Sequence, residues 1–307
     1  MKAVILAGGF GTRLQPLTNC MAKPLVPLLG KPLVMHIIDS MPAGVDQVIL
    51  AVNYRRQDLE DYFQENDVGR EVILVDESEP LGTGGALRNL KEHLDETFMM
   101  FNGDIVCSLD QELLIDFHRQ QGAMATLALW EVEDPQPFGV ADLRPDGRID
   151  CFQEKPAPGE ELSKLINAGI YVFEPGIMDY IPEGKVSLER EVFPHILAEG
   201  MSGMPFQGYW ADCGTLESFL EAQRLLLSHQ HGRSQLCHPG ARVKGASLGE
   251  NVYVGNALVS PGASVEHSVV MDGAQVGEGC ILRNCIVGPG ENIIDESAIY
   301  DEILCSL

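Results

Sequence analysis

The sequence lacks acidic residues where they would be expected. Its 307 residues hold 45 Asp and Glu against 21 Lys and Arg, a formal net charge of −24, yet the first acidic residue is Asp39. The acid-free stretch before it carries Lys2, Arg13, Lys23 and Lys31. A basic segment in so acidic a protein favours an anionic ligand. The scarcity of cations elsewhere argues against a nucleic-acid surface or an anionic membrane as partner.

Long apolar runs and ordered cysteine patterns are also missing. No run reaches the roughly 18 apolar residues of a transmembrane helix, and the apolar part of MKAVILAGGFGTR is too short for a signal peptide. The eight cysteines include no CxxC pair, and Cys280 and Cys285 are the closest two. We therefore expect reduced, mostly buried thiols in a cytoplasmic protein, not a zinc site or a disulfide framework.

Apolar runs alternate with helical patterns through the first two-thirds of the chain. This alternation predicts an α/β fold with a doubly wound, mostly parallel, Rossmann-like sheet. From 123 to 173 the pattern becomes strand-rich, which predicts an antiparallel addition beside the main sheet. The expected strands are 3–7, 47–52, 71–75 and 97–101, and the expected helices are 31–41, 55–65, 83–94, 187–199 and 215–228.

After residue 230 apolar residues recur every five or six positions between glycine-rich corners. This repeat predicts a short parallel β-helix of roughly three to four coils, because each coil takes three hexapeptides. A run of β-hairpins is the alternative, but its strands would alternate with period two. We expect two domains, 1–230 and 236–307. The expected inward positions are Leu248, Val254, Val259, Val265, Met271, Val276, Leu282, Val287, Ile293 and Ile299.

A glycine loop, Gly8-Gly9-Phe10-Gly11, follows the first apolar run, and Arg13 stands just behind it. A P-loop would need a Lys-Ser/Thr pair, and a dinucleotide fingerprint would need a third glycine where Leu14 stands. Ligands of such sheets bind at the carboxyl ends of strands, so we expect this loop and 102–104 (Asn-Gly-Asp) at one edge. The loop is suited to a polyphosphate.

These residues resemble the signature of the sugar-nucleotide pyrophosphorylases, which join a nucleoside triphosphate to a sugar 1-phosphate. The resemblance begins with LAGGFGTRLQPLT and AKPLVPLLGKP. It continues in family order through EPLGTGGAL (79–87), NGD (102–104), FGV (138–140), EKP (154–156), NAGIYVF (167–173) and YWADCGT (209–215). The C-terminal repeat resembles the left-handed β-helix found on several members.

The resemblance implies attack by a sugar-phosphate oxygen on the α-phosphorus, with pyrophosphate leaving. Neutralisation and alignment of two anions are then the main tasks, and no protein nucleophile is needed. It assigns Arg13 to the leaving phosphates and Lys23 to the region near the α-phosphorus. Asp104 and Asp212 would hold Mg²⁺, a cation that prefers oxygen ligands. These four are the expected catalytic residues.

The resemblance also implies the binding residues, whereas Lys2 and Lys31 are expected to contact no ligand. The nucleotide would be bound by Leu6, Ala7, Gly8, Gly9, Gly11, Thr12, Arg13, Gly82, Thr83 and Gly85. The sugar phosphate would be bound by Gly139, Glu154, Lys155 and Asn167.

The base loop looks more like that of guanylyltransferases and of less specialised archaeal or bacterial members than like that of thymidylyl- or uridylyltransferases. The length of the β-helix is similar to mannose-1-phosphate guanylyltransferases, which would make GDP-mannose from GTP and mannose 1-phosphate. Thymidylyl, uridylyl or adenylyl transfer to glucose 1-phosphate, and a promiscuous enzyme, stay open. So do a catalytically silent regulatory paralogue and a second, acyl-transferring activity of the β-helix, for which His267 is the obvious candidate base. The β-helix is expected to serve as an oligomerisation or lid module of a homo-oligomer.

Overall fold

The computed structural model describes residues 1–77 and 79–306, so the last residue of the predicted β-helix domain lies outside it. The chain forms two compact units. The first contains Met1–Gly9 and Ile37–Trp210, and the second contains Phe10–His36 and Ala211–Leu307. These units do not coincide with the expected domains 1–230 and 236–307, and that domain division stays a prediction.

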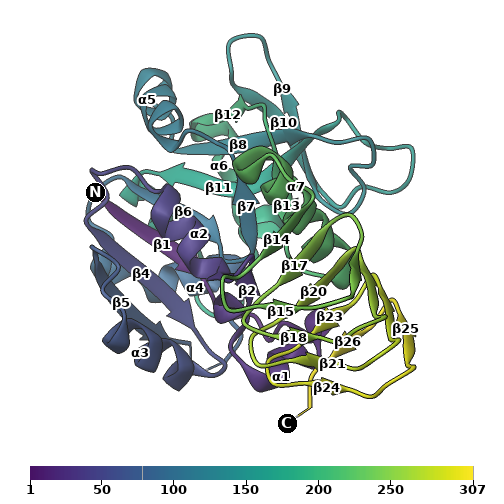
Figure 1. Ribbon diagram of the computed structural model, residues 1–307. Coiled ribbons are helices and arrows are strands. Elements are labelled where there is room, and N and C mark those ends of the chain that lie inside the picture. The colour runs from purple at the N-terminus through teal and green to yellow at the C-terminus, as the bar shows by residue number, and fades with distance from the viewer. Residues whose placement is uncertain (78, 307) are drawn as a thin grey trace. The chain divides into compact units, whose positions relative to one another are not determined.

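A nine-stranded sheet forms the centre of the first unit (Figure 1). Four neighbouring strands are parallel, because helical crossovers connect each of them to the next along the chain. Their buried residues, such as Val4 and Ile49, belong to one hydrophobic core. The predicted parallel strands are therefore confirmed. In spatial order they are β5 (Glu71–Asp76), β4 (Gln47–Val52), β1 (Lys2–Leu6) and β6 (Phe98–Asn102).

The other half of this sheet is mainly antiparallel, as predicted. Strand β11 pairs antiparallel with β6 and with β8, and β9 pairs antiparallel with β10. Tyr171 and Phe173 on β11 stack at a centroid distance of 5.3 Å in the core. The strands are β8 (Ala125–Glu131), β9 (Gly139–Leu143), β10 (Ile149–Glu154), β11 (Leu165–Phe173) and β12 (Met201–Pro205), which adds to β8 in parallel.

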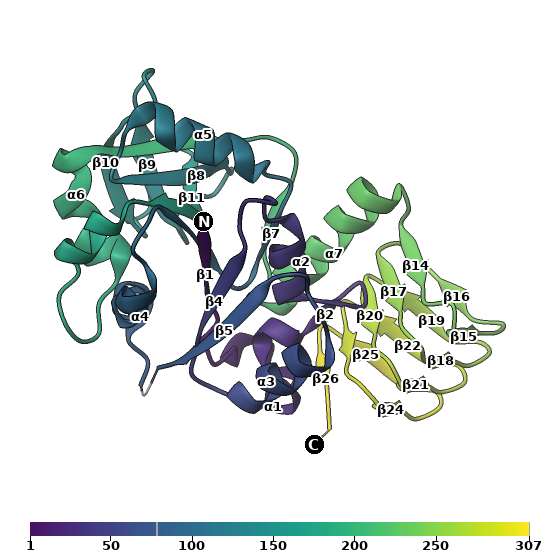
Figure 2. The same ribbon diagram turned by 90° about the vertical axis from the view of Figure 1, so that its left-hand side faces the viewer.

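Helices pack on this sheet, and two differ from their predicted form. The expected helix 83–94 is α-helical only as far as Asn89, and a separate 3₁₀ turn follows at Lys91–His93. The expected helix 187–199 begins as a π-helical turn, since Pro194 lacks an N–H for regular α-helical pairing with that turn. The helices are α3 (Arg56–Glu65), α4 (Gly82–Asn89), α5 (Gln111–Gln121), the π turn (Leu188–Val192) and α6 (Phe193–Gly200) (Figure 2).

The second unit begins with short elements from the acid-free stretch. A two-residue hairpin turn with Leu29 and Gly30 at positive φ joins β2 to β3. A β-carbon on Gly30 would overlap the hydroxyl of Tyr253, so this turn packs directly on the β-helix. The elements are a 3₁₀ turn (Thr12–Leu14), α1 (Leu17–Cys20), a 3₁₀ turn (Lys23–Leu25), β2 (Pro27–Leu28), β3 (Lys31–Pro32) and the start of α2 (Leu33–Ser40).

One long helix, α7 (Leu216–His231), precedes the β-helix in this unit. Thr215 and Ser218 form a capping box at its start, and Gly232 closes its end with φ 59°. Gln223 on α7 is buried and donates to the backbone and side-chain oxygens of Asn251 at 2.9 and 3.0 Å. The helix is therefore joined to the first coils of the β-helix by apolar packing and a buried amide pair.

Three parallel sheets make the β-helix, and the strand register repeats every 17 residues, as in Val265, Leu282 and Ile299. This confirms the hexapeptide reading, with one residue fewer per coil than three full hexapeptides. The sheets run β14-β17-β20-β23-β26, β15-β18-β21-β24 and β16-β19-β22-β25. Their strands are β14 (Gln235–Cys237), β15 (Arg242–Val243), β16 (Ser247–Leu248), β17 (Val252–Val254), β18 (Leu258–Val259), β19 (Ser264–Glu266), β20 (Ser268–Val270), β21 (Gln275–Val276), β22 (Ile281–Arg283), β23 (Ile286–Val287), β24 (Asn292–Ile293), β25 (Ala298–Tyr300) and β26 (Ile303–Leu304).

Two expectations about buried residues are corrected. Val270, and not Met271, aligns with Val254 and Val287 in the interior, because the first coils are offset by one residue. All eight cysteines are free, and contrary to expectation they are not mostly buried. The buried ones are Cys213, Cys280 and Cys285, whereas Cys20, Cys107, Cys151 and Cys305 are half-buried and Cys237 is exposed.

Candidate active site

The glycine loop starts where β1 ends, within the first unit. Leu6 closes the strand, and the amide of Ala7 still donates to the carbonyl of Ala51 at 2.9 Å. A β-carbon on Gly8 would lie 2.8 Å from Oε1 of Glu77, so a larger residue would displace this carboxylate. Gly9 is exposed. The loop thus offers backbone to a ligand, with one carboxylate at its side.

Glu77 is a candidate site residue that the sequence reasoning missed. It directly follows β5 and is only 9% exposed, and burial raises the pKa of its carboxyl group. The amide of Leu81 donates to Oε2 at 3.3 Å, and the Asn53 side chain donates to the Glu77 carbonyl at 2.8 Å. Its place after a parallel strand was the available signal, because ligands of such sheets gather at that edge.

The turn that carries Asp104 lies at the same edge, as predicted. Asn102 is in register with Leu6, and the amide of Gly103 donates to the Leu6 carbonyl at 3.0 Å. A β-carbon on Gly103 would lie 2.6 Å from that carbonyl oxygen, so only glycine permits this approach. Asp104 is half-buried beside it. Within the first unit, the glycine loop and Asp104 therefore share one edge of the sheet.

The glycine-rich start of α4 is shaped by tight packing. A β-carbon on Gly82 or Gly84 would press on Val186, and one on Gly85 would overlap a backbone carbonyl nearby. The hydroxyl of Thr83 donates to Glu189 at 2.7 Å and accepts from the amide of Leu188 at 2.9 Å. The Thr83 side chain therefore holds the π turn, and contact of Gly82, Thr83 and Gly85 with a base stays a prediction.

Two of the four sugar-phosphate candidates face each other across β9 and β10. Gly139 is in register with Glu154, and a β-carbon on Gly139 would lie 2.9 Å from Oε2 of Glu154. Burial, and then the nearby charge of Glu189, raise the pKa of Glu154, while Lys155 opposes them. Lys155 is exposed and has φ 52°, a conformation that costs a non-glycine residue energy and often marks a functional position.

Asn167 stands at an irregularity of β11. Its side chain donates to the hydroxyl of Tyr171 at 2.8 Å and accepts from the amide of Gly169 at 3.2 Å. The register with β8 shifts between Asn167 and Tyr171. A β-carbon on Gly169 would lie 2.7 Å from the side-chain nitrogen Nδ2 of Asn102. Asn167 therefore shapes a bulge that contacts the strand preceding Asp104.

The second unit holds the remaining predicted residues. Gly11 has φ 63°, and a β-carbon there would lie 2.7 Å from Cγ2 of Thr18 and 3.3 Å from Cβ of Lys23. Thr18 donates its hydroxyl to the Gly11 carbonyl at 2.9 Å. Thr12 and Arg13 occupy the exposed 3₁₀ turn that follows. Gly11 thus lets the loop fold closely onto the segment that bears Lys23.

Arg13 and Asp212 meet at Gly214. A β-carbon on Gly214 would lie 2.6 Å from Nη2 of Arg13 and 2.6 Å from Oδ1 of Asp212. The amide of Gly214 donates to the same Oδ1 at 2.5 Å, which orients the carboxylate at the end of β13 (Trp210–Asp212). The structure thus brings together a cation suited to phosphate and a carboxylate suited to a metal.

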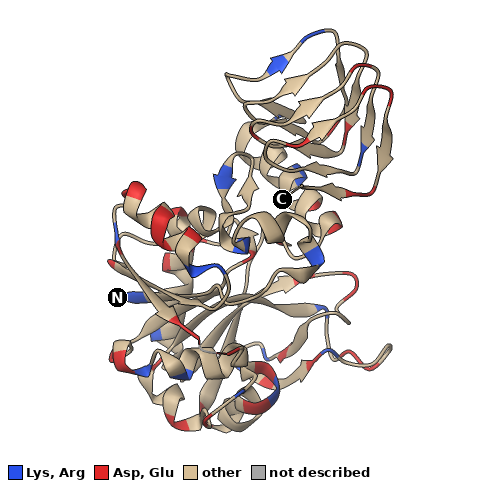
Figure 3. Cartoon of the chain, turned by 90° about the horizontal axis from the view of Figure 1, so that it is seen from below, with Lys and Arg blue, Asp and Glu red and all other residues tan. Residues whose placement is uncertain are grey.

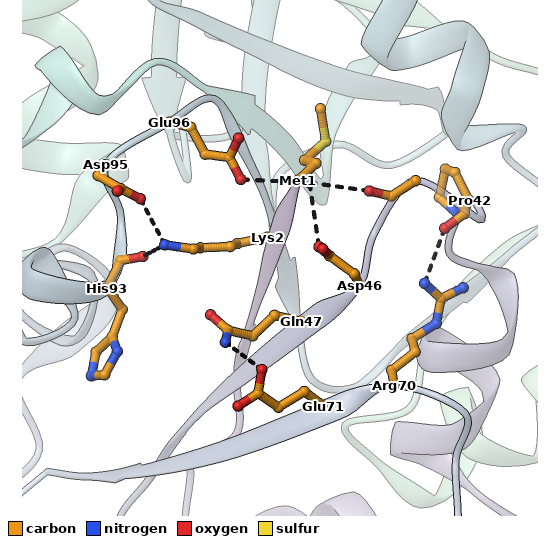
Figure 4. Close-up of polar contacts among 11 residues, drawn as sticks. Met1, Lys2, Pro42, Asp46, Gln47, Arg70, Glu71, His93, Asp95 and Glu96 are labelled. Carbon is orange, nitrogen blue, oxygen red and sulfur yellow. Dashed lines mark hydrogen bonds and ion pairs between the residues drawn. The ribbon is translucent and has the colours of Figure 1, made fainter.

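Lys2 forms an ion pair with Asp95 and does not lie at the glycine loop. Its ammonium group donates to Asp95 and to the His93 carbonyl, both at 2.6 Å, at the amino end of β1 (Figure 4). The glycine loop begins at the other end of that strand. Figure 3 shows Asp and Glu spread over many helices and loops, with fewer Lys and Arg between them. Lys2 is therefore held in an ion pair remote from the loop.

Comparisons with known proteins match both parts of the chain. A family model described as nucleotidyl transferase matches residues 2–229, and one described as GlmU-like, C-terminal hexapeptide, matches residues 227–302. The chain belongs to the nucleotidyl transferase family. This confirms the resemblance to sugar-nucleotide pyrophosphorylases and the expectation of an enzyme, and the hexapeptide match is consistent with a left-handed β-helix.

Several known proteins match most of this chain. A mannose-1-phosphate guanylyltransferase of Mycobacterium tuberculosis is 38% identical, over 89% of this chain and 80% of its own. A mannose-1-phosphate guanyltransferase of Neurospora crassa is 36% identical, over 86% of this chain and 73% of its own. The crystal structure of HddC from Yersinia pseudotuberculosis has a TM-score of 0.61 and 30% identity, over 72% of this chain and 97% of that one.

Nucleotidyltransferases of this family typically use a divalent metal. Within 1–77 and 79–306, no group of three or more His, Cys, Asp or Glu residues is arranged to hold a metal ion. No helix in the same residues is long and apolar enough to cross a membrane.

Proposed function

We propose that this enzyme transfers GMP from GTP to mannose 1-phosphate, giving GDP-mannose and pyrophosphate. The observation that carries the proposal is the meeting of Arg13 and Asp212 at Gly214. A guanidinium group neutralises phosphate oxygens in bidentate fashion, and a carboxylate beside it can hold the metal that those phosphates bring. The names of the M. tuberculosis and N. crassa relatives support the choice of substrates.

Each site residue then has a task in an in-line displacement. Arg13 binds the β- and γ-phosphates that leave, and Lys23 neutralises charge near the α-phosphorus. Asp104 and Asp212 would hold Mg²⁺, and the bound ion would supply Lewis-acid polarisation of the phosphate oxygens. The sugar phosphate is already ionised at neutral pH, so its oxygen attacks without a general base. These two cations and two carboxylates therefore act by alignment and charge stabilisation.

The glycine loop and the sugar residues position the two substrates. Leu6, Ala7, Gly8 and Gly9 present backbone to the nucleotide. Glu154 accepts hydrogen bonds from sugar hydroxyls, and its raised pKa reflects a buried carboxyl group that such donors would stabilise in the ionised form. Lys155 binds the phosphate of the sugar. Its left-handed backbone turns the side chain away from the regular course of β10, which supports a binding role.

Glu77 supports guanine as the base. Its Oε1 stands beside Gly8, and its carboxyl group is buried. A carboxylate only accepts hydrogen bonds, and guanine offers it two adjacent donors, the ring N1–H and the 2-amino group. Thymine and uracil offer one such donor, and adenine pairs its amino donor with an acceptor. Binding of guanine would also satisfy an ionised carboxylate that burial otherwise penalises.

A substrate matrix tests the proposal. Four or five nucleoside triphosphates are combined with hexose 1-phosphates, and pyrophosphate release is measured with Mg²⁺ and with chelator. We expect the highest kcat/KM for GTP with mannose 1-phosphate, and a loss of GTP preference of about tenfold or more in Glu77→Gln. Preference for another pair would overturn the substrate assignment. No turnover with any pair would favour a silent regulatory paralogue.

We also propose that the protein is a homo-oligomer that associates through the β-helix, and that it lies in the cytoplasm. Large apolar side chains are exposed on it, among them Ile294 at 74%, Tyr300 and Leu258, and association of two copies would cover such groups. The free cysteines suit a reducing compartment. Light scattering of Ile294→Asp against the unchanged chain tests the first point, with a smaller mass expected for the variant.

A further inference from the structure

The segment that carries Arg13 and Lys23 is built onto the β-helix. Residues Phe10–His36 belong to the same compact unit as the β-helix, and Gly30 contacts the hydroxyl of Tyr253 on β17. Both ribbon views show α1, which lies between Arg13 and Lys23 in the sequence, near β26 (Figures 1 and 2). The last coil of the β-helix therefore contacts the part of the chain to which phosphate binding is assigned.

Two cysteines lie at this contact. Cys20 is the last residue of α1, and Cys305 directly follows β26. Sγ of Cys20 is 3.8 Å from the carbonyl oxygen of Ser306, the residue next to Cys305, and the Cys20 thiol lies close enough to help raise the pKa of the Cys305 thiol. The Cys305 side chain packs on Gly288 of the preceding coil, because a β-carbon on Gly288 would lie 2.9 Å from its Sγ. Both cysteines are half-buried and thus accessible to a small oxidant.

We propose that Cys20 and Cys305 form a reversible disulfide that slows nucleotidyl transfer by displacing the segment between Arg13 and Lys23. The effect on turnover rests on the proposed function, whereas formation of the disulfide does not. Disulfide sulfurs are about 2.0 Å apart, closer than the sulfurs of two neighbouring thiols approach without a bond. Oxidation therefore pulls α1 toward β26.

Oxidised glutathione is a sufficient oxidant. The thiolate of Cys20 attacks one sulfur of glutathione disulfide, forms a mixed disulfide and releases one glutathione thiolate. Cys305 then loses its proton and attacks Sγ of Cys20, which expels the second glutathione. Two protein thiols are oxidised, one glutathione disulfide is reduced to two thiols, and the two protein protons end on those thiols.

The environment of the pair sets the order of these steps. Burial and the neighbouring Cys20 thiol raise the pKa of Cys305 to about 12, so Cys305 is a weak nucleophile. The first attack therefore falls to Cys20. In the second step the Cys305 thiol is already next to Sγ of Cys20, so its effective concentration there is high. Elsewhere in the chain, burial raises the pKa of Cys107 to about 11, which disfavours its reaction.

The full-length protein is equilibrated with glutathione at a series of oxidised-to-reduced ratios. Disulfides are located by mass spectrometry of peptides prepared without reduction, and pyrophosphate release from GTP and mannose 1-phosphate is measured on the same samples. Cys20→Ser and Cys305→Ser remove the pair one thiol at a time. Cys237→Ser is the matched control, because Cys237 is exposed in the same unit and has no part in the pair.

We expect the Cys20–Cys305 peptide pair to appear with oxidation and turnover to fall about ten- to a hundredfold, since small misplacements of catalytic groups have effects of this size. The loss should be reversed by dithiothreitol, persist in Cys237→Ser and vanish in both pair variants. Absence of the linked peptide pair, a mixed disulfide alone, or a linked pair with unchanged turnover would overturn the proposal. A reduced protein that is inactive with all substrates, yet forms the disulfide, would overturn only the proposed function and its regulation.

Discussion

Arg13 and Asp212 approach Gly214 so closely that a β-carbon there would lie 2.6 Å from Nη2 of the arginine and Oδ1 of the aspartate. All three residues belong to the second unit. The sequence motif YWADCGT marked Asp212 as a candidate, but it did not explain its glycine. The glycine leaves room for a cation and a carboxylate to converge.

Replacement of Gly214 tests this relationship. Gly214→Ala should lower kcat/KM about ten- to a hundredfold, because the methyl group must displace Arg13 or Asp212. Stability should change by no more than about 1 kcal/mol, since the clashing atoms are ends of side chains that can move. Turnover and urea denaturation are measured together. Gly44→Ala is the control, because a β-carbon at Gly44 meets no atom within 4 Å.

The metal assignment predicts a different pattern. Asp104→Asn should lower turnover about a thousandfold or more at saturating Mg²⁺, because a neutral amide is a poor ligand for a hard cation. The folded structure should be retained, since Asn has the same shape. Asp116→Asn, at an exposed ion pair with Arg119, is the control. Pyrophosphate release over a Mg²⁺ titration decides, and retained metal-dependent activity would show that Asp104 is no ligand.

Because the hairpin turn packs on the β-helix, we expect substitutions of Gly30 and Tyr253 to be energetically coupled. Gly30→Ala should lower the melting temperature and the turnover, because the turn has φ 79° and the new methyl group meets the Tyr253 hydroxyl. Adding Tyr253→Phe should recover part of the loss, leaving about 1 kcal/mol for the backbone conformation. Thermal unfolding of the single and double variants measures the coupling. Purely additive effects would mean that the two residues do not contact each other.

A buried histidine predicts a pH dependence of stability. His118 binds Thr126 at 2.8 Å and Glu174 at 3.1 Å, and burial lowers its pKa although Glu174 opposes the shift. Below a pH of about 6.5 the unfolded chain takes up a proton that the folded chain resists, so stability is present above that pH and falls below it. This single group contributes a slope of at most about 1.4 kcal/mol per pH unit.

Urea denaturation between pH 7.5 and 5.5 measures that slope. His118→Gln should flatten it, because glutamine does not titrate, whereas the exposed His195→Gln should leave it unchanged. Equal slopes in all three proteins would show that His118 has no part in it.

The acyl-transfer alternative for the β-helix is weakened by the place of His267. It occupies a coil corner at φ 45°, equivalent in the register to corners taken by Asn251, Asn284 and Asp301. Residues of this kind tolerate the left-handed conformation, so the corner accounts for the histidine. His267→Asn should therefore leave thermal stability and nucleotidyl transfer unchanged.

The sequence predicted the features that depend on local pattern, and it failed where the register along the chain shifts. The four parallel strands were predictable because apolar runs record burial locally, and 47–52 matches β4 at both ends. The repeat predicted the coils, yet it misassigned Met271, since one short coil shifts the register without changing the composition. The order of the glycine and lysine motifs along the chain marked the segment that is proposed to bind phosphate.

The sequence by itself thus determined the layers of the fold, the β-helix and the family, because these depend on local periodicity and on motifs read in order. Tertiary structure alone decided which distant residues meet. Glu77 lies against Gly8, Arg13 meets Asp212 at Gly214, and the Cys20 thiol lies against the backbone of Ser306, next to Cys305. Such pairs leave no trace in local pattern, because packing of separate elements, and not the spacing along the chain, sets their distance.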